Sequence, residues 1–417
     1  MIALASIPAG DLSHRRLLCI WLVAILCGAT APPVSSQGKP TQRGRGGVLW
    51  SLDGRTRRVG VRAINAEEIV CQSGTRSTRK VYRLDFDTRR FDVPNRPPDA
   101  VVQLVNGDEL CLRRLTSNDE VLTGTLCDRR VKVPLEYVRA IVFGDGSSPW
   151  VRGAIRTAFS KTEQAEDVVG LANGDRLVGE FVALNTSNLR INVADTERSV
   201  VFDRLAFLRF NWQLLSEMPA GDFQVVVELS GGSVLTGNRL SEPESSDICI
   251  RTAWGGNVVI PSRRMMSVRF LSKRIQRLAE VSPMTFHHKP FVGRQREYHV
   301  NRTINRDYAT HKRQRFFNSL GVTSGMSLTW QLDGAYSGFH SRFGIDDSAA
   351  NGAAVFVIRV DGQERYRSPA KASGEPAGFT GLIDVSGAKT LTLAVEYGPR
   401  GDLHDVANWL DPVLIRK

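Results

Sequence analysis

Two short stretches near the C-terminus concentrate residue types that can bind a sugar. They read GIDD (344–347) and HDVANW (404–409). Carboxylate and amide groups can fork onto adjacent hydroxyls, and an aromatic face can stack on the C–H face of a sugar ring. We therefore expect these two stretches to form a ligand or ion site. Its expected residues are Asp346, Asp347, Asp405, Asn408 and Trp409.

The same residues also allow a structural interpretation. Trp409 could fill a core, and Asp346 and Asp405 could hold loops by hydrogen bonds to the backbone. The two aspartates could also bind calcium, which prefers oxygen ligands. No other cofactor or metal is expected, because the His287-His288 pair has no Cys or carboxylate at ligand spacing.

The chain offers no recognisable catalytic set. Its middle part contains no Ser/His/Asp set, no acidic pair and no phosphate loop of the Walker type. A glycosidase needs two carboxylates about 5–9 Å apart across a cleft. Asp346 and Asp405 stay open as such a pair, but both lie in an expected binding module, so we predict that the protein is not an enzyme.

The elements that must position these residues are strands. VFVIRV (355–360) and LTLAVEY (391–397) alternate along their length and are rich in β-branched residues, which suits sheets packed face to face. Asp361-Gly362 can supply the positive φ values of a tight hairpin. We therefore predict a β-sandwich over residues 296–417.

The order of pieces from SLGVTS (319–324) to GDLHDVANWLDPVLI (401–415) resembles the NPCBM family of carbohydrate-binding modules, which have galactose-binding-like β-sandwiches. The resemblance covers about 100 residues and implies both this fold and sugar binding. Family members commonly read G-L-G-x-H near the first strand, where this chain has Thr323 in place of His. This copy is therefore expected to bind differently from its relatives, or not at all. The matching residues include Gly321, Leu332, Tyr336, Phe339, Gly344, Asp346, Asp347, Phe356, Asp361, Gly362, Asp384, Asp405, Asn408, Trp409 and Asp411.

The middle of the chain repeats. VVQLVNGDEL (101–110), VVGLANGDRL (168–177) and VVELSGGSVL (226–235) each predict a strand, a Gly turn and a second strand. From the turn glycine to a closing Phe the intervals are 36, 36 and 38 residues. The turn glycines are Gly107, Gly174 and Gly232, and the closing residues are Phe143, Phe210 and Phe270.

These intervals predict small, strongly bent β units. We expect a degenerate unit at 48–98 and three clearer ones at 99–150, 164–213 and 222–272. The pattern L-x-N-G-D-x-L-x-G resembles the opening strand pair of Sm-like barrels, with Gly179 and Gly237 at the last position. Such units look like a spacer or a docking scaffold.

A basic connector is expected at 273–295. From Lys273 to Arg315 there are 11 Lys or Arg and three acidic residues, with aromatic residues between them. Basic stretches with aromatics can bind nucleic acid, but a solvated connector whose aromatics dock on the next domain is the commoner case. The net charge of +12 equally suits an anionic polysaccharide or an acidic envelope surface.

The N-terminus predicts export. Arg15 and Arg16 precede a 15-residue apolar run, LLCIWLVAILCGATA, which is typical of a signal peptide and short for a membrane span of about 20 residues. We expect residues 1–36 to comprise the signal peptide and a short linker. Of the remaining cysteines, Cys111 and Cys127 are the first candidates for a disulfide. The alternative is that Cys71, Cys111, Cys127 and Cys249 are all small buried hydrophobes.

Together these features favour a secreted, non-catalytic carbohydrate-binding protein of the all-β class, located outside the cell, in the periplasm or in the cell envelope. The alternative is a structural or protein-interaction component of the envelope that binds no sugar. The expected partner is a glycan or an envelope polysaccharide, and the repeats could dock other proteins. Neither a nucleic-acid partner nor a membrane span after signal removal is expected.

Overall fold

The computed structural model describes residues 45–87, 96–144, 153–154, 158, 165–219, 221–241, 247–291, 293–399 and 401–417. The regular secondary structure of these residues is almost wholly β-strand, joined by tight turns and single-turn 3-10 helices, which confirms the all-β prediction. The described residues all belong to one unit of the chain. The predicted signal peptide lies outside the described residues. In the described part of the chain, no helix is long and apolar enough to cross a membrane.

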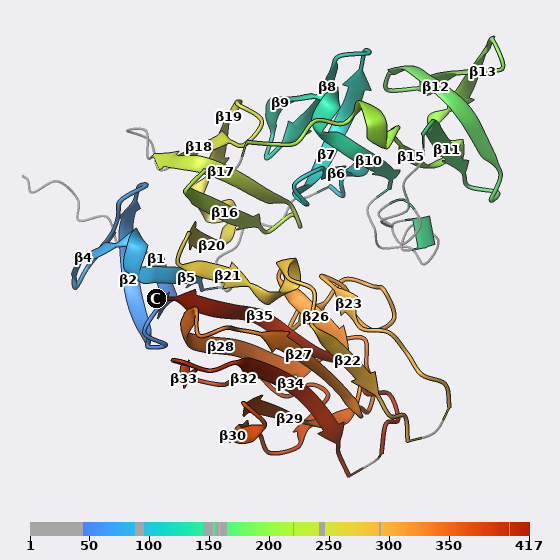
Figure 1. Cartoon of the computed structure of the whole chain (residues 1–417). Coiled ribbons are helices and arrows are strands. Elements are labelled where there is room, and N and C mark those ends of the chain that lie inside the picture. Colours follow the sequence, from blue (N-terminus) through green and yellow to red (C-terminus); the bar gives the residue numbers. More distant parts are fainter. Residues whose placement is uncertain are drawn as a thin grey trace, which may run out of the picture. The chain divides into compact units, whose positions relative to one another are not determined.

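Residues 45–272 contain four β units of one design, each with five strands and a 3-10 turn before the fifth (Figure 1). The first unit has β1 (Arg45–Ser51), β2 (Thr56–Ile64), β3 (Glu68–Cys71), β4 (Gly74–Ser77) and β5 (Val81–Phe86). The second has β6 (Ala100–Leu104), β7 (Glu109–Ser117), β8 (Val121–Leu126), β9 (Arg129–Pro134) and β10 (Val138–Phe143). The third has β11 (Asp167–Leu171), β12 (Arg176–Leu184), β13 (Asn188–Val193), β14 (Thr196–Val201) and β15 (Leu205–Arg209). The fourth has β16 (Phe223–Leu229), β17 (Val234–Ser241), β18 (Asp247–Thr252), β19 (Asn257–Pro261) and β20 (Met265–Ser272).

Each unit closes on itself because its first strand pairs with both its second and its fifth strand. In the third unit, Val169 on β11 pairs with Leu177 on β12 and with Leu208 on β15. The second strand is long and bends at a register shift, which lies between Phe181 and Ala183 in β12. The other three units have the same shift in their second strands, so all four are strongly bent antiparallel sheets.

The turn glycines adopt the conformation that the sequence predicted. Gly107, Gly174 and Gly232 have φ values of 86°, 95° and 84°, in the left-handed region that side chains with a Cβ rarely adopt. Gly179 has a different reason: an added Cβ would lie 1.9 Å from the carbonyl oxygen of Asn192 on the next strand. Glycine here allows the sheet to bend tightly.

The units share one sheet and one core. Ala140 on β10 pairs with Arg209 on β15, and Asp85 on β5 pairs with Ser267 on β20. Val234 on β17 pairs with Glu109 on β7 and joins these two pairs of units, so the twenty strands form a continuous hydrogen-bonded sheet. Most of their buried apolar residues form one cluster, and smaller clusters lie beside it. A unit of this size buries little core alone, so neighbouring units stabilise one another, as expected for repeats.

The C-terminal part is a β-sandwich of two antiparallel sheets (Figure 1). One sheet contains β21 (Ile275–Arg277), β23 (His299–Val300), β26 (Ser319–Val322), β28 (Tyr336–Ile345), β32 (Gly378–Phe379), β33 (Ile383–Asp384) and β35 (Ala407–Arg416). The other contains β22 (Thr285–His288), β27 (Met326–Gln331), β29 (Ala353–Val360), β30 (Gln363–Arg367), β31 (Lys371–Ala372) and β34 (Thr390–Tyr397). A short hairpin, β24 (Thr310–His311) and β25 (Gln314–Arg315), stands apart.

The expected connector contributes strands to the sandwich. Ile275 on β21 pairs with Ile415 on β35, and Phe286 on β22 pairs with Leu328 on β27. The sandwich therefore begins before residue 296, the boundary expected from the sequence. The sequence did not predict β21 and β22 because both are short and contain charged residues. They lie mostly at sheet edges, where only alternate side chains need to be apolar.

Strand β35 is buried along nearly its whole length. Trp409 points into the sandwich core, whereas Val413 and Ile415 pack against Leu52 and Tyr82 of the first β unit. The strand is buried up to Arg416, and its polar residues Asn408 and Asp411 are hydrogen-bonded inside the protein.

All four described cysteines are free thiols. Cys71 is buried, and Cys111, Cys127 and Cys249 are partly buried. Burial raises the pKa of Cys111 and of Cys127 to about 11, which keeps both protonated at neutral pH. The Cys111–Cys127 disulfide is thus not formed, and of the four expected buried hydrophobes only Cys71 is fully buried.

Candidate functional site

Trp409 lies in the sandwich core. Its side chain is 0% exposed, and its ring contacts Phe356 and Phe343 edge to face, with centroid distances of 5.1 Å and 5.9 Å. The ring thus occupies the place of a core residue, and neither of its faces is open to a sugar. This position fits the structural alternative that the sequence left open.

The two predicted stretches do meet, but inside the protein. The buried Asn408 donates its side-chain N–H to Asp346 at 3.0 Å. The same carboxylate accepts backbone N–H bonds from Thr310 at 2.7 Å and Ser348 at 2.9 Å. Burial raises the pKa of Asp346, and these hydrogen bonds act in the opposite direction. Asp346 therefore fixes the hairpin that contains Thr310 against the sandwich.

The other two aspartates also hold loops. Buried Asp405 accepts from the backbone N–H of Ala353 at 2.7 Å and from the hydroxyl of Ser324, and burial raises its pKa. Exposed Asp347 accepts from the backbone N–H groups of residues 312 and 313, at 2.8 Å and 2.7 Å. Four of the five predicted ligand residues are thus buried, and Asp347 alone reaches solvent. Their contact with a glycan stays a prediction.

An exposed aromatic group lies next to the second predicted stretch. Phe291 is 67% exposed, and its ring packs edge to face on Tyr397 with a centroid distance of 5.6 Å. Exposed Leu403 and His404 lie in the same loop as Asp402. We call this surface the Phe291 platform. Its residues are Phe291, Tyr397, Asp402, Leu403 and His404.

Specific contacts hold the platform in place. The backbone N–H of Phe291 donates to Asp402 at 3.0 Å, and the Tyr397 hydroxyl donates to the carbonyl of Lys289. Burial and the nearby Asp402 carboxylate raise the pKa of Tyr397, so its hydroxyl stays protonated. An apolar ring beside a carboxylate, an imidazole and a hydroxyl is the combination that suits a pyranose.

In the sequence Phe291 lies in the expected connector, so the sequence does not predict the platform. The local signal was a single Phe within a polar, basic stretch, which equally fits an aromatic that docks on a neighbouring domain. Only the pairing of β22 with β27 brings Phe291 to the loop around Asp402.

Comparison with known families identifies the sandwich. Residues 281–415 match the family model described as the NPCBM/NEW2 domain. This part of the chain is an NPCBM/NEW2 domain. The resemblance noted in the sequence is confirmed, and no curated protein matches the chain.

Solved structures of carbohydrate-binding modules share low similarity with the chain. The CBM51-2 and INT domains of Clostridium perfringens ZmpB are 16% identical, with 41% of this chain and 36% of that chain covered and a TM-score of 0.31. The CBM51 of Clostridium perfringens GH95 in complex with methyl-galactose is 15% identical, covering 34% and 99%, with a TM-score of 0.30. The tandem CBM51 modules of the Streptococcus pneumoniae family 98 glycoside hydrolase Sp3GH98 are 11% identical, covering 89% and 88%, with a TM-score of 0.30. This chain thus spans little more than a third of the first of these structures.

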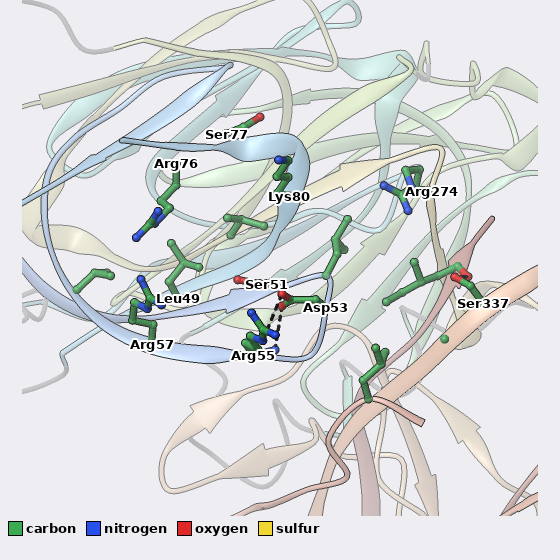
Figure 2. A pocket seen from close by; sticks show the side chains of 16 residues that line it. Leu49, Ser51, Asp53, Arg55, Arg57, Arg76, Ser77, Lys80, Arg274 and Ser337 are labelled. Atoms are coloured by element: carbon green, nitrogen blue, oxygen red, sulfur yellow. Dashed lines mark hydrogen bonds and ion pairs between the residues drawn. The ribbon is translucent and has the colours of Figure 1, made fainter. Parts of the chain in front are cut away.

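A cavity of about 590 Å³ lies where the first β unit contacts the NPCBM/NEW2 domain (Figure 2). Five cationic side chains and one carboxylate line it, above an apolar floor. We call it the basic cavity. Its charged residues are Asp53, Arg55, Arg57, Arg76, Lys80 and Arg274, and its apolar residues are Leu49, Leu52, Val59, Val81, Leu382 and Ile415.

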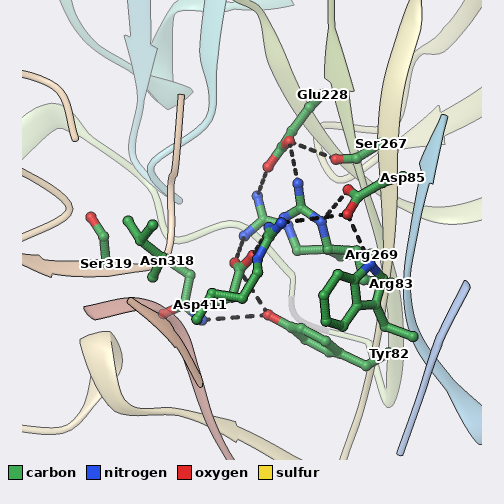
Figure 3. Close-up of polar contacts among 12 residues, drawn as sticks. Tyr82, Arg83, Asp85, Glu228, Ser267, Arg269, Asn318, Ser319 and Asp411 are labelled. Carbon is green, nitrogen blue, oxygen red and sulfur yellow. Dashed lines mark hydrogen bonds and ion pairs between the residues drawn. The ribbon is translucent and has the colours of Figure 1, made fainter. Parts of the chain in front are cut away.

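A buried ion cluster ties the first and fourth β units to the NPCBM/NEW2 domain (Figure 3). Arg83 donates to Asp411 at 2.7 Å and to Glu228 at 3.1 Å, and Arg269 donates to Glu228 at 2.6 Å. Asp411 has φ of 50° in β35, a left-handed conformation at a bulge that directs its carboxylate towards the arginines. The arginine charges hold the pKa of Asp411 well below its usual range.

A second cluster ties the second β unit to residues 302–315. Glu109 on β7 is buried, accepts from the Tyr308 hydroxyl at 2.8 Å and pairs with Arg302 and Arg315. The arginines lower the pKa of Glu109 against the effect of burial. The repeats are thus bonded to the NPCBM/NEW2 domain at two buried polar contacts.

No metal site stands out in the described regions, where no three His, Cys, Asp or Glu side chains gather as a set of ligands.

Proposed function

We propose that the protein is an exported, non-catalytic carbohydrate-binding protein whose NPCBM/NEW2 domain recognises a glycan. The observation that carries the proposal is the family match over residues 281–415. The similar structures include CBM51 modules that were solved in complex with GlcNAc and with methyl-galactose.

The Phe291 platform is the surface that we propose for the glycan. A sugar ring presents C–H groups on one face and hydroxyls at its edge, so it needs an apolar plane with polar groups beside it. Phe291 supplies an exposed ring, while Asp402 and His404 lie in the adjoining loop. The buried Asp346, Asp405 and Asn408 would then support the loops from within.

We propose that binding involves no catalysis and no cofactor. The only carboxylate pair raised by the sequence was Asp346 with Asp405, and both are buried and engaged by protein donors. A glycosidase pair must reach the glycosidic bond from both sides. Calcium would have to displace these protein donors, so we expect the binding to be the same with and without calcium.

The test is a glycan array probed with the full exported chain, in wild-type form and as Phe291→Ala. We expect a defined group of glycans to bind wild type and to lose most of their signal with Phe291→Ala. Trp212→Ala is the matched control, because Trp212 is an aromatic residue 46% exposed outside the NPCBM/NEW2 domain. Equal loss in both variants, or no bound glycan, would argue against the platform.

The second candidate is a structural or interaction component of the envelope. Two observations favour it: Trp409 and Asn408 are buried, and the repeats are bonded to the NPCBM/NEW2 domain at two buried polar contacts. Both are typical of a rigid structural protein and less so of a sugar-binding module on a flexible tether. A negative array together with a protein partner captured by the intact chain, and lost on disruption of the repeat surface, would select this candidate.

A further inference from the structure

The basic cavity is a second candidate ligand site, separate from the Phe291 platform. Its cations come from four places in the chain: Arg57 on β2, Arg76 on β4, Lys80 in the turn after β4, and Arg274 between β20 and β21. In Figure 2 these side chains surround one space, although they are distant in sequence. Arg57, Lys80 and Arg274 are exposed and Arg76 is half-buried, so all four can offer their charge to an anion that enters from solvent.

The cavity's own carboxylate does not neutralise them. Asp53 is engaged with Arg55, whose Nε lies 3.7 Å away and whose backbone N–H donates at 3.1 Å. Within the described residues, Arg57, Arg76, Lys80 and Arg274 have no ion pair with a carboxylate. By contrast Arg58, the neighbour of Arg57 on the same strand, pairs with Asp87 at 2.9 Å.

The walls of the cavity are held firmly against each other. Leu52 and Ile415, on opposite sides of the contact, belong to one buried apolar cluster. Gly54, with φ of 75°, lies so close to Leu382 that an added Cβ would be 2.5 Å from the Leu382 Cβ. The cavity is therefore a built feature of the fold.

The size and the floor indicate the class of ligand. A volume of about 590 Å³ is in the usual range of ligand pockets and far exceeds the ~30 Å³ of one water, so a lone inorganic anion would not fill it. The floor is aliphatic, and none of the described lining residues is aromatic, so bases of a nucleic acid would find no stacking partner.

We propose that the basic cavity binds an acidic saccharide, with sugar rings on the aliphatic floor and carboxylate or sulfate groups paired with Arg57, Arg76, Lys80 and Arg274. The saccharide part of this assignment rests on the proposed function of the adjoining domain, whereas the anionic part rests on the cavity alone. The protein then has two glycan contacts, a platform for a neutral ring and a cavity for an acidic one.

The test is isothermal titration of the full chain with four probes of similar length: an oligogalacturonate, a heparin-type oligosaccharide, a neutral oligosaccharide and an oligothymidylate. We expect one or both acidic saccharides to bind, and the neutral one not to bind at the cavity. Replacing both Arg57 and Arg76 by Ala should weaken this binding roughly tenfold or more, the usual scale for charge-assisted hydrogen bonds.

Two controls separate this site from general charge attraction and from the platform. Arg58→Ala removes the same charge one residue away and should change the affinity less than about twofold, the scale of a screened surface charge. Phe291→Ala should leave acidic-saccharide binding unchanged, so failure of the platform and failure of the cavity can be told apart. Thermal melting of each variant checks that it is folded.

Three results would overturn the proposal. One is equal loss in Arg58→Ala and in the Arg57→Ala/Arg76→Ala variant, which would show attraction by net charge. Another is oligothymidylate binding as tightly as the saccharides with the same variant dependence, which would assign the cavity to nucleic acid. The third is the absence of binding by both acidic saccharides at about 0.15 M ionic strength, where exposed charges are screened beyond about 8 Å.

Discussion

Replacing Asp411 by Asn tests how the repeats and the NPCBM/NEW2 domain are joined. The carboxylate faces Arg83, Arg269 and Arg342, with N–O distances of 2.7, 3.4 and 2.9 Å. The side chains of Arg83 and Arg269 are each 1% exposed, so the guanidinium charges cannot turn to water. The change therefore leaves an uncompensated buried positive charge.

The magnitude follows from the charge balance of the cluster. Three arginines face three carboxylates, since Glu228 and Asp85 complete the set with Asp411. Breaking a buried pair by removing one partner costs about 3–5 kcal/mol. We expect Asp411→Asn to lower the free energy of unfolding by that amount, although the side chains have nearly equal volume. Asp119→Asn, at an exposed position, should change it by less than about 0.5 kcal/mol.

Urea unfolding of the full chain, followed by tryptophan fluorescence, measures both effects. The double variant Asp411→Asn/Arg342→Met restores the charge balance and should be more stable than the sum of the single changes by about 1 kcal/mol or more. A loss below about 1 kcal/mol in Asp411→Asn, or strict additivity in the double variant, would refute the claim that this cluster joins the two parts.

Four further predictions follow from the same structure. Burial lowers the pKa of His340 to about 4, below its unfolded value of about 6.5, so stability should fall as the pH drops from 6.5 towards 4; His340→Gln, followed by thermal melting against pH, should flatten this slope. Trp409→Ala should cost about 3–5 kcal/mol in a denaturant titration because it leaves a core cavity, and a near-neutral effect would mean that the ring is not in the core. Gly174→Val should cost about 1 kcal/mol or more in unfolding free energy, since φ of 95° strains a β-branched residue whatever the free space; an unchanged midpoint would contradict the turn geometry. N-terminal sequencing of exported protein should find a start between Ala31 and Gly38, and an intact Met1 in a cytoplasmic pool would contradict export.

Local patterns of the sequence predicted the strands, the turns and the fold class. Asp361 and Gly362 both have the positive φ values expected of a tight hairpin, whereas in the pair Asn106-Gly107 only Gly107 has one. The alternation in 355–360 and 391–397 likewise became paired strands β29 and β34. These signals are local because the backbone conformation and the burial of one face depend on neighbouring residues. The bounds expected for the repeat domains and the Sm-like resemblance of their turns stay predictions.

The candidate site was harder to predict because it depends on contacts between distant residues. Asp346 and Asn408 were expected in one site, and they are hydrogen-bonded to each other. The sequence could not show that the Asp346 carboxylate would accept its hydrogen bonds from protein groups such as the Thr310 N–H. The position of Phe291 depends on the pairing of β22 with β27, which lies about 40 residues later in the chain. The basic cavity needs Arg57 and Arg274 to line one space, and no local pattern in the sequence predicts that they do so.

The affinity of the full chain for its strongest array glycan, measured by titration with wild type and Phe291→Ala, tests the central claim most directly. Taking a Phe side chain out of water is worth about 1.5–3 kcal/mol when complete, so with Phe291 67% exposed we predict roughly tenfold weaker binding and an unchanged melting temperature. Equal affinities of the two proteins, or no measurable binding of any glycan by wild type, would contradict the assignment of glycan recognition to the Phe291 platform.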